Sequence, residues 1–195
     1  MEERIALFDM DGTIADYDFQ MRNDLKKLGN ELLPDNLHGN VPAWLAERKR
    51  IIGSQSGWWR NLPEIKSGME IMDFCTEVGF RIHILTQGPY HNRIAWGEKF
   101  DWCDTHVSPI APDYVLSVTR EGKGGQYGRL FVDDYPPFME AWLKHRPRGL
   151  GLMPINSENK SFSHPQVVKY DVNDWRSPEL VERVHGAYNR PSINR

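Results

Sequence analysis

The sequence has few cysteines, no long apolar run and no excess of basic residues. Only Cys75 and Cys103 occur among 195 residues, which is too few for a disulfide framework and predicts buried thiols in a reducing compartment. No stretch approaches the roughly 18 uninterrupted apolar residues of a membrane span. The first residues lack the basic and apolar regions of a secretory signal. We therefore expect a cytoplasmic protein with no membrane partner.

The overall charge is slightly acidic. There are 24 Lys and Arg against 27 Asp and Glu, a formal net charge of -3. This balance disfavours a protein that holds a long track of nucleic-acid backbone, so we expect no stable nucleic-acid partner. A small anionic ligand is compatible with it. The oligomeric state stays open, a homodimer included.

The order of apolar segments predicts an α/β fold with a parallel sheet, because short apolar runs alternate with amphipathic ones. The length suits one full-sized domain with a small insert. The predicted strands are Ile5–Phe8, Arg81–Leu85, Leu130–Val132, Leu150–Met153 and Val167–Tyr170. The predicted helices are Phe19–Leu33, Gly68–Val78, Tyr90–Asp104, Pro136–Lys144 and Ser177–Ala187.

A long insert separates the first two predicted strands. About seventy residues lie between them, far more than one crossover helix needs. This segment contains helix signals, a basic run at 47–50 and the tryptophans Trp44, Trp58 and Trp59. We predict a small helical cap over 17–63, inserted into a core domain formed by 1–16 and 64–195.

The strongest chemical signal is the sequence Asp9-Met10-Asp11-Gly12-Thr13, directly after the first predicted strand. In extended backbone, residues two apart point the same way, so Asp9 and Asp11 face one pocket at the carboxyl end of the sheet. Two such acids can bind a divalent cation and can divide the roles of nucleophile and proton donor. The alternative is an ordinary acidic turn.

Three further motifs lie at or near strand ends. Thr86 and Gln87 follow the second strand, and Asp133-Asp134 follow the strand at 130–132. Adjacent carboxylates repel one another unless a cation or a proton compensates, which favours a metal. Lys123 lies between glycines, which allow it to enter a site but equally describe a surface loop.

In this order, the four motifs resemble those of the haloacid dehalogenase (HAD)-like phosphatase superfamily, which implies a Rossmann-like core. Within it, the chain is similar to the 5'(3')-deoxyribonucleotidase family. That similarity is carried by Ala15-Asp16-Tyr17, Trp44-Leu45-Ala46, Gly57-Trp58-Trp59, Tyr90-His91, Gly97-Glu98-Lys99-Phe100 with Trp102, Thr119-Arg120 and Asn173-Asp174-Trp175. The chain departs from the family by one extra residue before Lys123 and by Gln87, where a small hydroxyl residue is common.

The resemblance implies a Mg²⁺-dependent phosphomonoesterase that hydrolyses nucleoside 5'-monophosphates, deoxyribonucleotides in particular, through an aspartyl-phosphate. It implies Asp9 as the nucleophile and Asp11 as the general acid and base. Mg²⁺ would be held by Asp9, the Asp11 backbone carbonyl and Asp134, with Asp133 hydrogen-bonding around the metal's water shell. The implied phosphate-binding residues are Thr86, Gln87 and Lys123. The implied substrate-binding residues are Tyr17, Trp44, Leu45 and Trp58.

Two alternatives stay open at this point. One is a HAD-like phosphatase for another small phosphate ester or for the 3'-phosphate of a nucleic-acid end. The other is a binding module that has kept the fold and lost the chemistry, since fold alone does not give function. The preferred base and the choice between ribose and deoxyribose are also open.

Overall fold

The computed structural model describes residues 3–29, 32–35, 37–39, 41–89, 92–119 and 122–192. The helices and strands in chain order are β1 (Ile5–Phe8), α1 (Tyr17–Lys27), α2 (Ala43–Gly53), α3 (Lys66–Val78), β2 (Arg81–Gln87), α4 (Arg93–His106), β3 (Val115–Thr119), β4 (Leu130–Val132), α5 (Pro136–His145), β5 (Leu150–Pro154), β6 (Val167–Tyr170) and α6 (Pro178–Asn189). None of the helices in these ranges combines the length and the apolar character needed to cross a membrane.

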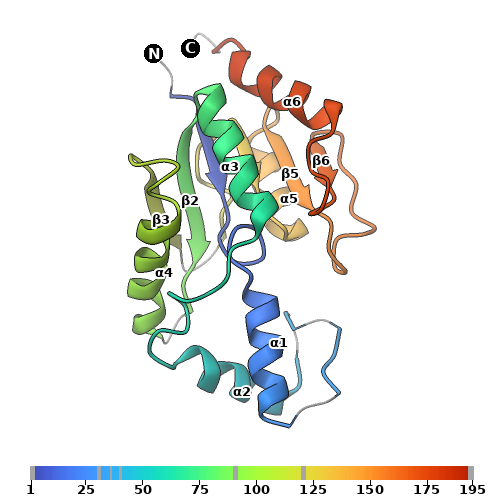
Figure 1. Ribbon diagram of the computed structural model, residues 1–195. Coiled ribbons are helices and arrows are strands. Elements are labelled where there is room, and N and C mark those ends of the chain that lie inside the picture. The colour runs from blue at the N-terminus through green and yellow to red at the C-terminus, as the bar shows by residue number, and fades with distance from the viewer. Residues whose placement is uncertain are drawn as a thin grey trace.

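The strands form one six-stranded sheet in the order β3-β2-β1-β4-β5-β6. All of its strand pairs are parallel, and the strands point toward α1 and α2 (Figure 1). The strand order reverses direction between β1 and β4. Parallel sheets bind ligands beyond the carboxyl ends of their strands, at such a reversal. The fold therefore places the residues that follow β1 and β4 at the natural ligand site.

Both faces of the central strands are buried, which explains why they are continuous apolar runs in the sequence. Ala6 and Phe8 of β1 belong to a large hydrophobic cluster that includes residues of α3, α4 and α6. Ile5 and Leu7 point to the other face and pack in a second cluster with residues of α5. This alternation is the two-residue period of a β-strand.

Most predicted elements are confirmed, with small shifts at their ends. The strands at 5–8, 130–132 and 167–170 match the structure, and the other two extend by two residues and one residue, to Gln87 and Pro154. Gly79 ends α3 in the left-handed conformation, at φ 104°. The Ser177 side chain accepts a hydrogen bond from the Leu180 N–H and caps α6. Tyr90, His91 and Arg120, which the sequence analysis used, lie outside the described residues.

One prediction about local structure was wrong, and one strand was missed. Helix α1 ends at Lys27 and does not continue to Leu33, because Leu28 is its C-cap and Gly29 adopts a φ of 83°. Leu32 is consequently 93% exposed and does not extend the apolar stripe. The strand β3 was not predicted. It lies at the edge of the sheet and all of its residues are half-buried, so it lacks the apolar run of a central strand.

The inserted segment leaves and re-enters the core at one point. The Asp16 N–H donates to the Pro63 carbonyl at 2.7 Å, and the Ile65 N–H donates to the Ile14 carbonyl at 2.7 Å. Between these crossings, α1 and α2 lie beyond the carboxyl ends of the strands (Figure 1). We keep the name cap segment for residues 17–63, the range predicted for the cap.

Candidate active site

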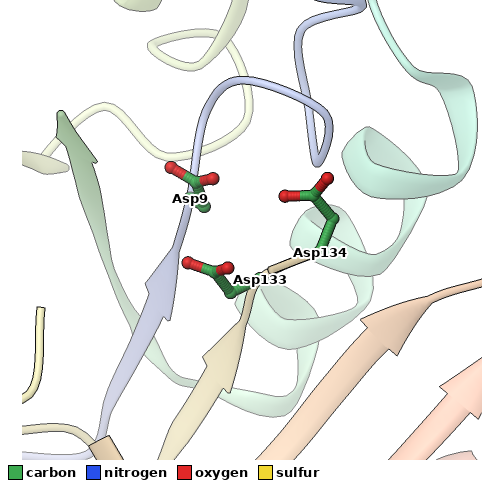
Figure 2. A group of neighbouring side chains, drawn as sticks. All are labelled: Asp9, Asp133 and Asp134. Carbon is green, nitrogen blue, oxygen red and sulfur yellow. The ribbon is translucent and has the colours of Figure 1, made fainter. Parts of the chain in front are cut away.

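Three carboxylates meet where β1 and β4 end. Asp9 follows β1, Asp133 and Asp134 follow β4, and the side chains face one another (Figure 2). One oxygen from each lies within 4.8 Å of the others. Asp9 and Asp134 line a cavity of about 380 Å³, together with Asp11 and Lys123. The structure thus brings together the acids of two predicted motifs and the predicted lysine.

Lys123 is buried between two of these acids. Its Nζ lies 2.5 Å from Asp9 Oδ1 and 2.8 Å from Asp133 Oδ2. Burial favours a lower pKa for Lys123, but the charges of Asp133 and Asp9 outweigh burial and raise the pKa. Burial raises the pKa of Asp9 to about 7, even though Lys123 acts to lower it. Lys123 therefore stays charged, and a further positive charge nearby would stabilise the ionised forms of the acids.

The two acids after β4 have different environments. Asp133 is fully buried and both of its oxygens accept hydrogen bonds, from Lys123 and from the Tyr135 N–H. Asp134 lines the cavity, and its Oδ2 accepts a hydrogen bond from Asn156 Nδ2 at 3.2 Å. Burial and the charges of Asp133 and Asp9 raise the pKa of Asp134 well above its usual value. Asp134 therefore has more capacity left for a ligand than Asp133.

Gly12 permits the close approach of the two strand ends. Its φ is 78°, a conformation that side chains with a Cβ rarely adopt. A Cβ on Gly12 would lie 2.6 Å from Asp134 Oδ2. The Gly12 N–H donates to the Ala15 carbonyl at 2.9 Å, which closes the turn. Glycine is therefore required here both by the backbone conformation and by the position of Asp134.

A second buried lysine, not predicted as a site residue, contacts Asp11. Lys99 of α4 is fully buried, with its Nζ 2.5 Å from Asp11 Oδ2. The same Nζ donates to Thr86 Oγ1 at 2.8 Å and to the Gln87 carbonyl at 2.9 Å. The other carboxylate oxygen of Asp11, Oδ1, is buried without a hydrogen-bond partner among the described residues. Lys99 thus fixes one oxygen of Asp11 and leaves the other unused.

The ionisable groups of this region are unbalanced in charge. When all are ionised, the carboxylates of Asp9, Asp11, Asp133 and Asp134 exceed the ammonium groups of Lys99 and Lys123 by two negative charges. Buried charges are tolerated only when they are compensated. One divalent cation would compensate them, and carboxylate oxygens are the ligands that Mg²⁺ prefers.

Aromatic rings of the cap segment form another part of the cavity wall. Tyr17, Trp59 and His38 line it. The Tyr17 ring centroid lies 5.6 Å from that of Trp59 and 5.8 Å from that of His38. His38 Nε2 lies 2.8 Å from Asp18 Oδ1, and this hydrogen bond raises the pKa of His38. This part of the wall therefore combines flat aromatic surfaces with the polar ring of His38.

The predicted substrate-binding residues do not all reach this wall. Tyr17 lines the cavity, whereas Trp44, Leu45 and Trp58 do not. Leu45 is fully buried, and Trp58 is 7% exposed with its Nε1 donating to Asp24 Oδ2 at 2.8 Å. Trp44 is 44% exposed and packs under Arg48. Two of these three side chains thus serve the packing of the cap segment, and the third lies on its surface.

The predicted phosphate-binding residues also differ in their surroundings. Gln87 and Lys123 line the cavity. Thr86 is fully buried, and its hydroxyl accepts the hydrogen bond from Lys99. The hydroxyl of Thr86 is therefore in contact with the lysine that holds Asp11.

Sequence reasoning assigned no role to Lys99 or its neighbour Glu98, although a signal was present. Ala95, Trp102 and Cys103 form the buried stripe of α4, and Glu98 and Lys99 occupy the same stripe at three- and four-residue spacing. Charged residues on a buried helix face are rare unless they are paired. Glu98 Oε2 accepts a hydrogen bond from the Trp59 N–H at 3.1 Å, so this pair of charged residues positions both walls of the cavity.

Comparison with known proteins identifies the fold. No family model and no curated protein matches the sequence. A haloacid dehalogenase-like family hydrolase from Xanthomonas campestris is similar in structure, with a TM-score of 0.53 and 12% identity over 97% of this chain and 100% of that chain. A protein assigned as a HAD hydrolase from Bacillus subtilis, bound to magnesium, gives a TM-score of 0.56 and 12% identity, over 95% of this chain and 100% of that chain. A HAD hydrolase of family IA from Entamoeba histolytica gives a TM-score of 0.51 and 11% identity, over 93% of this chain and 99% of that chain. The chain therefore has a HAD-like α/β fold, which confirms the predicted fold class.

Proposed function

We propose that the protein is a Mg²⁺-dependent phosphomonoesterase that hydrolyses nucleoside 5'-monophosphates. The observation that carries this proposal is the position of Asp9, at the reversal of strand order, beside a buried lysine and two further acids. The resemblance of the sequence motifs to a nucleotidase family adds the substrate class. The HAD-like fold, shared with hydrolases, is consistent with the reaction.

The acidic cluster fits a magnesium ion. Asp9 and Asp134 would hold it together with the backbone carbonyl of Asp11. Asp133 would act around the ion's water shell, because both of its oxygens already accept hydrogen bonds within the protein. Mg²⁺ favours few carboxylate ligands and keeps several waters. When bound, it supplies positive charge that offsets the repulsion between the Asp9 carboxylate and a dianionic phosphate.

Asp9 is the nucleophile of the proposed reaction. Lys123 holds its Oδ1 and thereby leaves Oδ2 to attack phosphorus. The bond between phosphorus and the ester oxygen breaks as an aspartyl-phosphate forms on Asp9. Lys123 also carries a positive charge into the cavity, where it would contact the phosphate oxygens.

Asp11 would transfer the protons. Its Oδ1 has no hydrogen-bond partner among the described residues, while Lys99 holds its Oδ2. Protonated Asp11 gives its proton to the departing sugar oxygen. It then takes a proton from the water that attacks the phosphorus of the aspartyl-phosphate, which releases phosphate and the free Asp9 carboxylate. Lys99 would act as a positioning residue that fixes the direction of this proton transfer.

The base of the nucleotide would lie against Tyr17 and Trp59. An aromatic ring that stacks on a base contributes about 1–3 kcal/mol, and these rings line the same cavity as Asp9, Asp11 and Asp134. An apolar face of Tyr17 against the sugar would leave a 2'-hydroxyl without a hydrogen-bond partner, which favours deoxyribose. This assignment replaces Trp44 and Trp58 with Trp59 as the tryptophan beside the substrate.

Steady-state kinetics with dUMP, dTMP, dGMP, UMP, a nucleoside 3'-monophosphate and a sugar phosphate would test the substrate class. We expect activity in Mg²⁺, none in EDTA, and the highest kcat/KM on a 5'-deoxyribonucleotide. The variant Tyr17→Ala should lower kcat/KM on nucleotides by about 5- to 150-fold, from the loss of stacking. Phe19→Ala is the matched control, because Phe19 is a 56% exposed aromatic of the same helix.

Other outcomes would redirect the proposal. Equal efficiency on the sugar phosphate, or no loss in Tyr17→Ala, would indicate a general phosphatase for small esters. Preference for a 3'-phosphate end would indicate a nucleic-acid substrate. No hydrolysis of any ester, with Mg²⁺ still bound, would indicate a binding module. A large loss in Trp44→Ala would show that this exposed ring reaches the substrate.

A further inference from the structure

The loop after β5 holds one acid of the cluster. Asn156, two residues beyond the end of β5, lines the same cavity as Asp9 and Asp134. Its Nδ2 donates to Asp134 Oδ2 at 3.2 Å and lies 3.4 Å from the Asp134 carbonyl oxygen. Asp9 and Asp134 face one another at the ends of β1 and β4 (Figure 2). Asn156 therefore contacts Asp134 from the end of a third strand, beside the acidic cluster.

The direction of the Asn156 amide follows from its partners. Its Oδ1 accepts hydrogen bonds from the backbone N–H groups of Glu158 and Asn159, at 2.9 and 3.0 Å. A backbone N–H can only donate, and an ionised carboxylate can only accept. Because the amide oxygen lies on two N–H groups, the NH₂ group of Asn156 must point to Asp134.

Asn159 fixes the loop that carries Asn156. It is fully buried, and its Nδ2 donates to the Pro154 carbonyl at 2.8 Å and to the Asp134 carbonyl at 3.0 Å. Its Oδ1 accepts a hydrogen bond from the Asn156 N–H at 3.0 Å. Asn159 thereby joins the end of β5 to the segment that follows β4. These backbone contacts set the position of Asn156 relative to Asp134.

The hydrogen bond from Asn156 distinguishes the two oxygens of Asp134. Oδ2 accepts the amide N–H, and a Cβ on Gly12 would lie 2.6 Å from the same oxygen. Among the described residues, none donates a hydrogen bond to Oδ1 of this carboxylate. The amide is neutral, so it does not reduce the negative charge that attracts a cation. One oxygen of Asp134 is thus held by the protein, and the other is left for a cation.

We propose that Asn156 is a positioning residue that presents Asp134 to the cation through one oxygen and thereby favours Mg²⁺ over Ca²⁺. Mg²⁺ requires near-ideal octahedral geometry, whereas Ca²⁺ takes about six to eight oxygens and accepts carboxylates through both of their oxygens. An Asp134 with one oxygen already engaged suits Mg²⁺ and offers less to Ca²⁺. Residues that hydrogen-bond to metal ligands orient those ligands. The inference rests on the magnesium site of the proposed function and adds the selectivity of that site.

Isothermal titration calorimetry with magnesium chloride and with calcium chloride, on protein freed of metal, tests the proposal. In Asn156→Ser, the hydroxyl can still accept from the N–H groups of the loop, but the donor to Asp134 is lost. The affinity for Mg²⁺ should fall by about 10- to 100-fold, the usual loss when the hydrogen-bond partner of a metal ligand is removed. The affinity for Ca²⁺ should fall by less than about threefold, because the released Asp134 Oδ2 offers that ion a second oxygen.

The matched control is Asn173→Ser. Asn173 Nδ2 also donates to an aspartate, at 3.2 Å from Asp171 Oδ1, but both residues are exposed and lie outside the acidic cavity. This variant should change neither affinity by more than about twofold, because its amide orients no ligand of the cation. An equal loss of Mg²⁺ affinity in both serine variants would overturn the proposal. An equal loss for Mg²⁺ and Ca²⁺ in Asn156→Ser would overturn it as well.

The variant Asn156→Asp guards against a loss of loop structure. Aspartate keeps the shape of the side chain and can accept both backbone hydrogen bonds of Asn156, but it replaces the donor to Asp134 with an oxygen. The ratio of Mg²⁺ to Ca²⁺ affinity should therefore fall in this variant too. An unchanged ratio in both variants of Asn156, or no Mg²⁺ binding by the wild type, would overturn the proposal. Because the readout is ion binding without substrate, a protein that binds Mg²⁺ but hydrolyses no ester would contradict only the proposed function.

Discussion

The substitution Lys99→Met tests whether the lysine missed by sequence reasoning holds the active site together. Methionine keeps an unbranched apolar side chain that ends one atom earlier, but it removes the charge of lysine and its hydrogen bonds to Asp11, Thr86 and the Gln87 carbonyl. Removing one partner of a buried ion pair destabilises a protein by about 3–5 kcal/mol. The Asp11 side chain is 26% exposed, so water can solvate part of it. We therefore expect a loss near the lower end, about 3 kcal/mol.

For a chain of this size, a loss of about 3 kcal/mol corresponds to a fall in Tm of about 6–12 °C. Urea denaturation in EDTA, followed by circular dichroism, measures the free energy of unfolding without the influence of a metal. Lys27→Met is the matched control, because Lys27 forms an ion pair with Asp24 at 2.7 Å but is 72% exposed. Exposed pairs contribute about 0–1 kcal/mol, so the control should lose less than about 1 kcal/mol.

The double variant Lys99→Met/Asp11→Asn separates the ion pair from general packing. Asparagine removes the carboxylate that Lys99→Met leaves without its partner, so the double variant should be more stable than the sum of the two single losses predicts. Strictly additive losses would refute the interpretation that Lys99 and Asp11 act as a pair. A loss in Lys99→Met no larger than that in Lys27→Met would refute it as well.

Three further predictions concern the acidic cluster. Gly12→Ala should abolish Mg²⁺ binding in calorimetry through the clash with Asp134, whereas Gly29→Ala, with a similar φ but no atom within 4 Å, should keep it. Asp134→Ala should raise the Mg²⁺ concentration needed for half-maximal activity more than Asp133→Ala does, and the reverse order would exchange their roles. Burial raises the pKa of Asp9 to about 7 from 3.8, so its ionisation opposes folding and stability in EDTA should fall as the pH rises from about 4 through 7. In Asp9→Asn, the loss of unfolding free energy between pH 5 and pH 8, measured by urea denaturation, should be smaller. An unchanged loss would contradict the attribution of this pH dependence to Asp9.

The central sheet could be predicted from sequence because parallel strands buried on both faces are apolar along their whole length. The strand 130–132 is only three residues long, yet all three are buried and it was found. The edge strand β3 has half-buried residues and was missed. The spacing of the apolar residues Leu28 and Leu32 is typical of a helix, so the helix was predicted to continue past Gly29. The positive φ of Gly29 is not helical, and the helix ends before it.

The acids of the candidate site were predictable for a related reason. Residues that follow parallel strands lie at one edge of the sheet, so Asp9 and the pair Asp133-Asp134 could be placed at one site without a structure. Lys99 and Asp11 are 88 residues apart and come from a helix and a turn. No local pattern fixes their contact. The choice between Trp58 and Trp59 depends on the orientation of a turn held by Glu98, which the sequence does not encode locally.

Trapping of the phosphorylated enzyme tests the central claim most directly. The protein is mixed with a ³²P-labelled nucleoside 5'-monophosphate and Mg²⁺, quenched in acid within one turnover, digested and analysed by mass spectrometry. The account predicts a phosphate on the peptide that contains Asp9, its loss in hydroxylamine, and neither labelling nor turnover in Asp9→Asn. Phosphate on another residue, or substantial turnover by Asp9→Asn, would contradict it.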